Sequence, residues 1–495
     1  PMAFLKHLPK NFLREPLSYL KLPFTGLSSL PMRKPRKLSR VMAHSCSIKD
    51  LPQIVSWPKD GGPFITLPQV FSEQPGSRHI LKSNLGMYRI QMGGNSYNQD
   101  KELGLHYQLH RGLGIHHTMA NEQNIPLPIT IFIGGPPAHS VAAVMPLPEG
   151  LSELIFAGLL GGRRFRYIRL GHHVLSDDAD FCITGWVTGN NTKPEGPFGD
   201  HLGYYSLVHD FPLLKVDKVY HRKNAIWPFT VVGRPPQEDT SFGKLIHELT
   251  GSIVPYELPG VKSLHAVDEA GVHPLLLAIG SERYLPYKEG RPSELLTQAH
   301  AILGFNQCSL AKYLFIIAHQ DNPQLNCSDI KSYIQHLLER VDWMNDLHFQ
   351  TKTTMDTLDY SGDGLNKGSK VIVACRGDVK RQLTTTLPDG FSLSKTWGQP
   401  RFPMPGVLTI QGPTFQNYSH ETSIIEDLAE RLSYQDIKKI PLIVLVDDSL
   451  MSSNNMKNWL WVTFTRSDPA RDIYGVEAVT QHKHWGCKKS LIIDA

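Results

Sequence analysis

Short runs of alternating or β-branched apolar residues dominate the chain from about residue 46 to residue 235. Segments such as PITIFIG (128–134) and DFCITGWVTG (180–189) are separated by glycine, proline and asparagine turns. Alternation with a period of two is typical of strands with one buried face. The pattern therefore favours a β-rich domain with a barrel-like arrangement.

Helical periodicity follows at 238–254, where Phe242, Leu245, Ile246 and Leu249 recur at spacings of three and four. We expect a linker helix here. Beyond it, amphipathic helices alternate with apolar strands, which is typical of an α/β or α+β domain. The clearest examples are a helix in 327–341 with an N-cap near Ser328, and strands in 312–319, 370–375 and 440–448. Residues 376–422 are rich in Pro, Gly, Thr and Ser and predict a long loop.

Composition makes this an ordinary globular protein of more than one domain. The chain has 495 residues, 41% of them hydrophobic and 20% charged, and single cores stop growing near ~250 to 300 residues. The net charge of +5 is dispersed apart from RKPRK at 33–37. Because no nucleic-acid-binding motif accompanies that segment, we read it as a solvated loop and expect no nucleic-acid partner. The charge leaves peripheral contact with an anionic membrane surface open.

The six cysteines are scattered, without the paired spacing of a zinc site. This usage indicates a reducing compartment, and we expect a cytoplasmic protein. No apolar run approaches the ~18 residues of a membrane-spanning helix, and no signal peptide is recognisable. The chain starts at Pro1 and ends with SLIIDA (490–495), which reads as a buried strand. We therefore expect it to be a trimmed product or a fragment.

Two acids, Glu195 and Asp200, lie on the segment KPEGPFGDHLGYYS (193–206). The prolines and glycines between them restrict or permit particular backbone angles, so this loop has a nearly fixed shape. Two close carboxylates repel each other, and we expect one to stay protonated near neutral pH and to donate a proton. The alternative is a surface turn with incidental acids.

Three other segments carry polar residues of a different kind. Asn84 and Arg89 lie in KSNLGMYRIQ, and a break near Gly86 is needed to present both to one pocket. His110 lies in YQLHRGLGIHH, and Glu153 opens an apolar helix that Ser152 could cap. Asn, His and Glu together supply the oxygen and nitrogen ligands that suit Mn²⁺ or Mg²⁺.

The order of these motifs resembles the UbiD-type decarboxylases that use prenylated FMN. The motifs are N-x-x-x-x-R, H-R-G, P-E-G-x-S-E and E-G-P-F-G-D-H-x-G-Y-Y, supported by segments 224–239, 467–473 and 484–495. The resemblance covers most of the chain from about residue 40 onward, and we expect the family's N-terminal domain to be largely absent from this sequence.

The resemblance implies roles for individual residues. Asn84, His110 and Glu153 match the positions that bind Mn²⁺ (or Mg²⁺) at the cofactor phosphate, with K⁺ nearby. Arg89 matches an arginine that meets the substrate carboxylate and the cofactor, Glu195 an acid bonded to it, and Asp200 the proton donor. Further cofactor contacts are implied for Arg111, Met145 and Lys488, with Lys489 as an alternative to Lys488.

The family also implies a domain plan. We expect a remnant of an N-terminal region (1–45), a split β-barrel domain that binds prenylated FMN (46–237), a linker helix (238–255), a C-terminal α/β dimerisation domain (256–480) and a tail that returns to the cofactor site (481–495).

The expected function is the reversible, non-oxidative decarboxylation of an aromatic or α,β-unsaturated acid, with the flavin as electron sink. A 3-polyprenyl-4-hydroxybenzoate of quinone biosynthesis is one candidate substrate. A flavin prenyltransferase would supply the cofactor, and a homodimer or homohexamer is expected. The alternatives are an inactive flavin-binding or assembly paralogue and a metal-dependent hydrolase.

Overall fold

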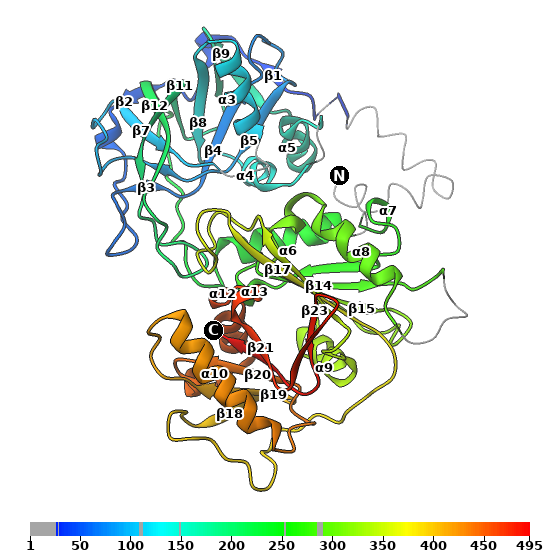
Figure 1. The fold of residues 1–495 in the computed structure, drawn as a ribbon. Coiled ribbons are helices and arrows are strands. Elements are labelled where there is room, and N and C mark those ends of the chain that lie inside the picture. Colours follow the sequence, from blue (N-terminus) through cyan, green and yellow to red (C-terminus); the bar gives the residue numbers. More distant parts are fainter. Residues whose placement is uncertain (1–25, 28, 108–111, 148–149, 252–253, 285–290) are drawn as a thin grey trace. The chain divides into compact units, whose positions relative to one another are not determined.

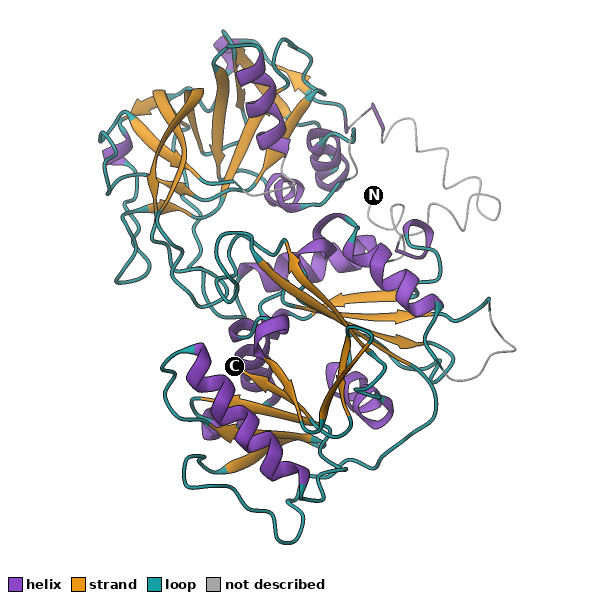
Figure 2. Ribbon diagram, viewed as in Figure 1, coloured by secondary structure: helices purple, strands orange, loops and turns teal. Residues whose placement is uncertain are grey.

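The computed structural model describes residues 26–27, 29–107, 112–147, 150–251, 254–284 and 291–495. The chain divides into two compact units, one up to Phe242 and one from Gly243. Each unit combines helices with sheets (Figures 1 and 2). The prediction of an α+β protein is confirmed.

The first unit consists mainly of strands. In chain order its elements are β1 (Met32–Arg33), η2 (Arg36–Leu38), β2 (His44–Cys46), η3 (Ile48–Asp50), β3 (Phe64–Ile65), β4 (Pro68–Glu73), β5 (Ser83–Gly86), β6 (Ile90–Gln91), β7 (Glu102–Leu105), α3 (Gly112–Glu122), β8 (Leu127–Ile133), α4 (Pro137–Val144), α5 (Glu153–Gly161), β9 (Arg166–Leu170), β10 (His173–Ser176), β11 (Phe181–Glu195) and β12 (His209–His221). Helix α6 (Glu238–Thr250) follows, at the position predicted for the linker helix.

A nine-stranded sheet organises this unit, in the order β3-β6-β7-β12-β11-β8-β4-β5, with β2 added to β12. Its side chains alternate between two cores, as the pleat requires. On β8, Ile131 packs in the core that includes Leu113 of α3, whereas Phe132 packs in the core that includes Leu154 of α5. The hydrogen-bonded path ends at β3 and β5 among the described residues, so closure into a barrel stays a prediction.

The second unit alternates strands with helices. Its elements are α7 (Val254–Glu257), β13 (Ser263–Ala266), η4 (Asp268–Ala270), β14 (Leu275–Gly280), α8 (Glu294–Leu303), η5 (Asn306–Leu310), β15 (Tyr313–Ala318), α9 (Ile330–Arg340), β16 (Leu347–Thr353), β17 (Gly368–Cys375), β18 (Pro400–Met404), β19 (Val407–Gln411), α10 (Tyr418–Ser433), β20 (Leu442–Val446), α11 (Ser449–Ser453), α12 (Met456–Arg466), α13 (Pro469–Asp472), β21 (Ile473–Gly475), β22 (Ala478–Gln481), β23 (His484–Cys487) and β24 (Leu491–Asp494).

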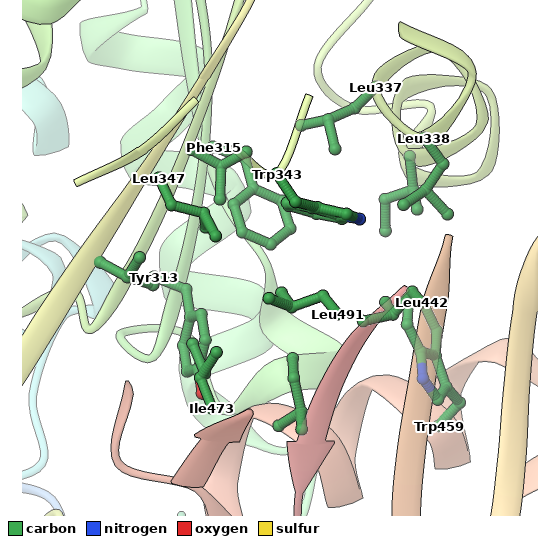
Figure 3. A pocket seen from close by; sticks show the side chains of 14 residues that line it. Tyr313, Phe315, Leu337, Leu338, Trp343, Leu347, Leu442, Trp459, Ile473 and Leu491 are labelled. Carbon is green, nitrogen blue, oxygen red and sulfur yellow. The ribbon is translucent and has the colours of Figure 1, made fainter. Parts of the chain in front are cut away.

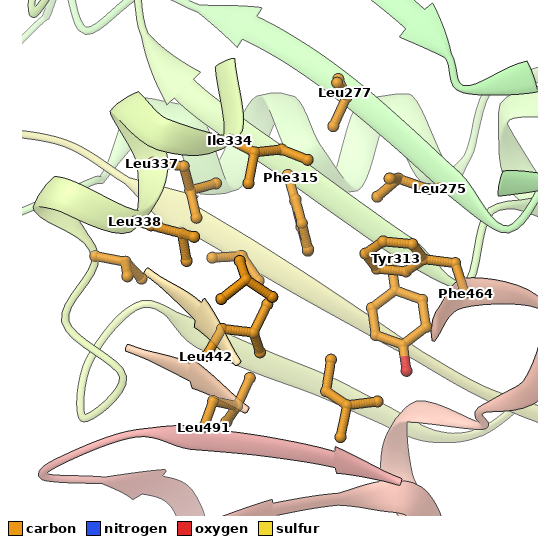
Figure 4. Packing of buried hydrophobic residues seen from close by; sticks show 14 of the residues in the cluster. Leu275, Leu277, Tyr313, Phe315, Ile334, Leu337, Leu338, Leu442, Phe464 and Leu491 are labelled. Atoms are coloured by element: carbon orange, nitrogen blue, oxygen red, sulfur yellow. The ribbon is translucent and has the colours of Figure 1, made fainter. Parts of the chain in front are cut away.

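Two mixed sheets form the layers of this unit, β13-β14-β15-β17-β16 and β18-β19-β20-β24-β21. The three central strands of each sheet are parallel, and the edge strands are antiparallel. Parallel strands are buried on both faces and therefore read as continuous apolar runs. Helix α8 covers the outer face of the first sheet and α10 that of the second, while α9 and α12 pack with both sheets in the core between them (Figure 4).

That central core contains one small cavity (Figure 3). Its volume is about 10 Å³, and its walls are apolar side chains such as Phe315, Trp343 and Trp459. A space of this size holds no more than about one water molecule. It is a packing defect of the core and offers no room for a substrate.

Several sequence predictions differ from the structure in detail. The stretch 376–422 contains β18 and β19 and is not one long loop. The N-cap of α9 is Asp329, whose carboxylate accepts the backbone N–H of Ser332, and not Ser328. Ser152 stands at the N-cap position of α5 but makes no capping hydrogen bond.

All six cysteines are free, and four of them are buried: Cys182, Cys327, Cys375 and Cys487. Among the described helices, none has the length and apolar character required to span a bilayer.

Candidate functional site

The loop that follows β11 brings the two acids together. Glu195 is the last residue of β11 and lies opposite His209, the first residue of β12. Between these strands the loop folds into a small hairpin of its own, in which Asp200 N–H donates to Tyr204 O at 3.0 Å and Ser206 N–H to Phe198 O at 2.8 Å. The hairpin leaves both acids buried, Glu195 with 0% and Asp200 with 5% exposure.

Neighbouring strands and turns hold the loop in this shape. Gly61 N–H donates to Pro197 O at 2.7 Å, and a Cβ on Gly61 would lie 2.1 Å from Gly196 O. Only glycine permits this approach. Gln91 Oε1 accepts the N–H of Gly196 at 2.8 Å. The loop is therefore fixed by its surroundings as well as by its prolines.

Arg89 joins the two acids. It lies in the break between β5 and β6 that the sequence required near Gly86. Its Nε and Nη2 donate to Oε1 and Oε2 of Glu195 at 2.8 and 3.0 Å, and its Nη1 donates to Oδ2 of Asp200 at 2.5 Å. The guanidinium also lies over the Phe198 ring, 4.7 Å from its centroid. This planar, forked contact is the geometry that arginine offers to carboxylates.

The guanidinium changes the protonation that we expected of these acids. Burial raises the pKa of Glu195, but the charge of Arg89 and hydrogen bonds from His106 and Arg89 outweigh it and lower that pKa to about 2. Burial also raises the pKa of Asp200, but His201 and Arg89 hold it below its ordinary value. Both acids are therefore ionised in this conformation, and the expectation that one stays protonated is wrong here. Repulsion between the acids is offset by the cation between them.

Two histidines extend the cluster, and neither was predicted from the sequence. Nδ1 of His106, directly after β7, lies 3.2 Å from Oε2 of Glu195. His201 contacts Oδ1 of Asp200 through its backbone N–H at 2.8 Å and through Nδ1 at 3.0 Å. His201 was visible next to Asp200 in the motif. His106 was not, because its contact depends on the register of β7 against β6.

A second group of predicted residues gathers around β5. Asn84 lies on this strand, and a Cβ on Gly112, the first residue of α3, would lie 2.3 Å from Asn84 Oδ1. Glu153, at the start of α5, accepts a hydrogen bond from the backbone of Leu85. Met145 is buried directly after α4. The structure thus places Glu153 against the backbone of Leu85, which follows Asn84 on β5, and Asn84 precedes Arg89 by five residues in the sequence.

The remaining predicted residues are not joined to this group by described contacts. His110 and Arg111 lie outside the described residues. Lys488 belongs to the second unit, where its side chain is exposed between β23 and β24. Lys489 forms an ion pair with Glu477 at 2.9 Å within the same unit. The cofactor contacts of His110, Arg111 and Lys488 stay predictions.

The group around Glu153 fits a hard divalent cation. Burial raises the pKa of Glu153 to about 7, and no basic side chain in the described part of the chain forms an ion pair with it. The hydroxyl of the adjacent Ser152 is buried and lacks a hydrogen-bond partner among the described residues. Carboxylate and amide oxygens are the donors that Mn²⁺ or Mg²⁺ prefers, and Glu153 and Asn84 carry such oxygens next to β5.

Two family models match successive parts of the chain. Residues 32–235 match the family model of the 3-octaprenyl-4-hydroxybenzoate carboxy-lyase Rift-related domain, and residues 240–375 match that of the C-terminal domain. A protein of Chlamydia pneumoniae, named as one of the subunits of a 4-hydroxybenzoate decarboxylase, is 39% identical over 480 residues, which are 95% of this chain and 76% of that protein. An uncharacterized protein of Chlamydia trachomatis is 38% identical over 467 residues, 92% of this chain and 75% of the relative.

Solved structures share the fold at low sequence identity. The vanillic acid decarboxylase of Sedimentibacter hydroxybenzoicus in closed form has a TM-score of 0.61 at 19% identity, with 84% of this chain and 82% of that chain covered. The UbiD-class enzyme HmfF of Pelotomaculum thermopropionicum in complex with FMN has a TM-score of 0.56 at 19% identity, with 73% and 78% covered. The matches of both domains and of a relative along nearly the whole chain establish that this protein belongs to the UbiD family of carboxy-lyases.

Proposed function

We propose that this protein decarboxylates a hydroxylated aromatic acid without net oxidation, with prenylated FMN as its cofactor. The observation that carries the proposal is the buried cluster in which Arg89 bridges Glu195 and Asp200. A guanidinium that binds a carboxylate next to an acid that can return a proton is what a decarboxylation requires of the protein.

The names of similar proteins support the choice of substrate class and cofactor. The family model refers to 3-octaprenyl-4-hydroxybenzoate, one relative to 4-hydroxybenzoate, and one similar structure to vanillic acid. Two structures of HmfF were determined with FMN or prFMN. A polyprenylated hydroxybenzoate in quinone biosynthesis is the most specific form of the proposal.

Arg89 would bind the substrate through its carboxylate. Glu195 holds Nε and Nη2 of the guanidinium in one plane, which leaves the Nη1 side, now in contact with Asp200, as the position for exchange. The incoming carboxylate takes the place of Asp200 on Arg89. Rigid positioning of this kind contributes to catalysis by removing orientational freedom.

The same exchange would prepare Asp200 as a proton donor. Burial raises the Asp200 pKa, whereas His201 and Arg89 together hold it below its ordinary value. When the guanidinium turns to the substrate, Asp200 loses that partner and its pKa rises, so it takes up a proton. After CO₂ has left, this proton passes to the ring carbon that carried the carboxylate.

Asn84 and Glu153, with His110 as the third predicted ligand, would hold a divalent cation at the cofactor phosphate. A phosphate that faced Glu153 without a cation would be repelled by it. When bound, the prenylated flavin supplies the electron sink for the bond that breaks. Lys488 and K⁺ remain predicted contacts of the cofactor.

Expression with and without a flavin prenyltransferase tests the proposal. We expect the absorbance spectrum of prenylated FMN, and CO₂ release from hydroxybenzoates, only in the protein made with the prenyltransferase. Asp200→Asn should keep the spectrum and lose turnover by about 100-fold or more, the size of a lost general acid. Glu153→Gln should lose bound flavin.

Two outcomes would reject this function. A protein that binds the flavin but releases no CO₂ from any aromatic acid would be an inactive paralogue. Hydrolytic activity in flavin-free protein would favour the metal-dependent hydrolase instead.

Turnover that survives Asp200→Asn would remove Asp200 from the role of proton donor.

The setting of the enzyme follows from the same proposal. The flavin prenyltransferase is its cofactor supplier, and we expect assembly into a homodimer or homohexamer through the second unit. The six free cysteines support a reducing compartment, the cytoplasm.

A further inference from the structure

His106 is held rigidly beside Arg89. Its backbone N–H donates to Arg89 O at 3.4 Å, because β6 and β7 pair directly before this point. Its ring stacks on Phe211 at a centroid distance of 4.2 Å and an interplanar angle of 27°. The residue is only 5% exposed. The imidazole therefore has one fixed orientation in the cluster.

The contact with Glu195 determines the tautomer of this ring. Nδ1 lies 3.2 Å from Oε2 of Glu195, the same oxygen that accepts from Nη2 of Arg89. An ionised carboxylate only accepts hydrogen bonds, so Nδ1 carries the proton. Burial and the charge of Arg89 lower the His106 pKa, which keeps the imidazole neutral. Nε2 is then an acceptor.

No described residue donates a hydrogen bond to this acceptor. Nε2 of His106 is buried and has no hydrogen-bond partner among the described residues. A buried polar atom without a partner is costly, and such atoms in native proteins call for an explanation. The His106 ring and the Arg89 guanidinium both contact Oε2 of Glu195. Arg89 is the group assigned to the substrate carboxylate. A donor group on the same substrate would satisfy Nε2.

We propose that Nε2 of His106 accepts a hydrogen bond from a ring hydroxyl of the aromatic acid whose carboxylate Arg89 binds. The inference rests on the proposed function and makes His106 the residue that recognises the ring hydroxyl. A phenolic O–H pairs with Nε2, whereas an unsubstituted ring or a methoxy group leaves it unpaired. Sites that bind a hydroxyl reject analogues without it far better than apolar pockets reject an added group.

Two substitutions separate this role from the contact with Glu195. His106→Asn places an amide N–H near the position of Nδ1 and leaves nothing at the position of Nε2. His106→Gln places its side-chain amide near the position of Nε2 but removes the N–H that donates to Glu195. His336→Asn is the matched control, because His336 is also buried, with an unpartnered Nε2, but lies on α9 of the second unit.

The experiment measures dissociation constants by calorimetry, and kcat/KM by CO₂ release, for benzoate, 4-methoxybenzoate and the three monohydroxybenzoates on flavin-loaded protein. We expect His106→Asn to weaken the preferred hydroxybenzoate by about 10- to 100-fold and benzoate by less than about 3-fold. His106→Gln should retain part of the hydroxyl preference. His336→Asn should leave all ratios unchanged.

Equal losses for hydroxylated and unsubstituted acids in His106→Asn would overturn the inference, since His106 would then only orient Glu195. Should that variant not fold, the wild-type protein decides: equal affinity for benzoate and for every hydroxybenzoate overturns it, and at least about tenfold tighter binding of one isomer supports it. If the wild type binds and turns over none of these acids, the proposed function itself fails. The two failures are thus distinguishable.

Discussion

Arg89 is one cation between two buried carboxylates, so its loss leaves both of them without their guanidinium partner. We expect Arg89→Met to lower the free energy of unfolding of the first unit by about 3 to 5 kcal/mol, the cost of removing one partner of a buried ion pair. Urea unfolding followed by circular dichroism measures it.

A second substitution checks the cause of this loss. Arg89→Met combined with Glu195→Gln removes one of the stranded charges and should recover part of the stability, without recovering activity. If the double variant is less stable than Arg89→Met, packing of the arginine side chain, and not charge, explains the loss.

The depressed pKa values of Glu195 and Asp200 predict how stability depends on pH. Glu195 has a pKa of about 2 in the fold, below its unfolded value of ~4.3, so its contribution of roughly 3 kcal/mol is complete above pH ~4.5 and is lost as the pH falls toward 2. Asp200 acts in the same direction. Unfolding by urea between pH 7 and pH 3 should show a shallower acid decline in Glu195→Gln. Glu122→Gln, an exposed position of the same unit, should keep the wild-type profile.

At the scale of residues, sequence motifs identified Arg89, Glu195 and Asp200, and the structure brings these three together. The charge state could not be predicted from the two acids alone, because it depends on how Arg89, in the break between β5 and β6, lies between them. His106 was missed for a similar reason. Its role arises from a strand register and an unpaired nitrogen, and neither can be read from residue types.

Among the elements, the loop between β11 and β12 depends on a close contact with the turn before β3. We expect Gly61→Ala to destabilise the first unit by about 1 to 3 kcal/mol and to reduce turnover at least tenfold. The new Cβ would lie 2.1 Å from Gly196 O, so the backbone at Gly196 would have to move. Thermal unfolding and a CO₂-release assay check both effects.

The matched glycine is Gly243 in α6, where a Cβ meets nothing within 4 Å. Gly243→Ala should stabilise the protein by about 0.5 to 1 kcal/mol, because alanine is the better helix former. Activity should not change. Equal effects of the two substitutions would show that the contact between Gly61 and the loop does not position the acids.

Periodic elements were predictable to within a few residues, as α6, α9, β8, β15, β17 and β20 show. Strands β18 and β19 were not, because β18 (PRFPM) contains two prolines and no clear alternation, and β19 pairs with β20, a strand that is distant in sequence. The cap of α9 was misplaced by one residue, a usual uncertainty when neighbouring Ser and Asp can both cap.

For the whole molecule, the two units contain separate hydrophobic cores. We expect Trp459→Ala, at a side chain 1% exposed, to cost about 3 to 5 kcal/mol in the second unit only. Hydrogen exchange by mass spectrometry should show faster exchange in β15, β17 and β20 and unchanged protection in β8 and β11.

Ile131→Ala, fully buried in the first unit, is the reciprocal variant. It should loosen β8 and β11 and leave β15 and β17 protected, at a cost of about 2 to 5 kcal/mol. Equal loss of protection in both units from either substitution would mean that they unfold as a single cooperative block.

The buried thiols offer a way to follow this behaviour without added probes. Burial raises the pKa of Cys182 in the first unit and of Cys375 in the second, and that of Cys487 to about 12. Since the thiolate is the reactive form, these positions are shielded from alkylation until the chain around them opens. A short pulse of iodoacetamide followed by peptide mapping would therefore record, from one sample, when each half of the polypeptide becomes accessible.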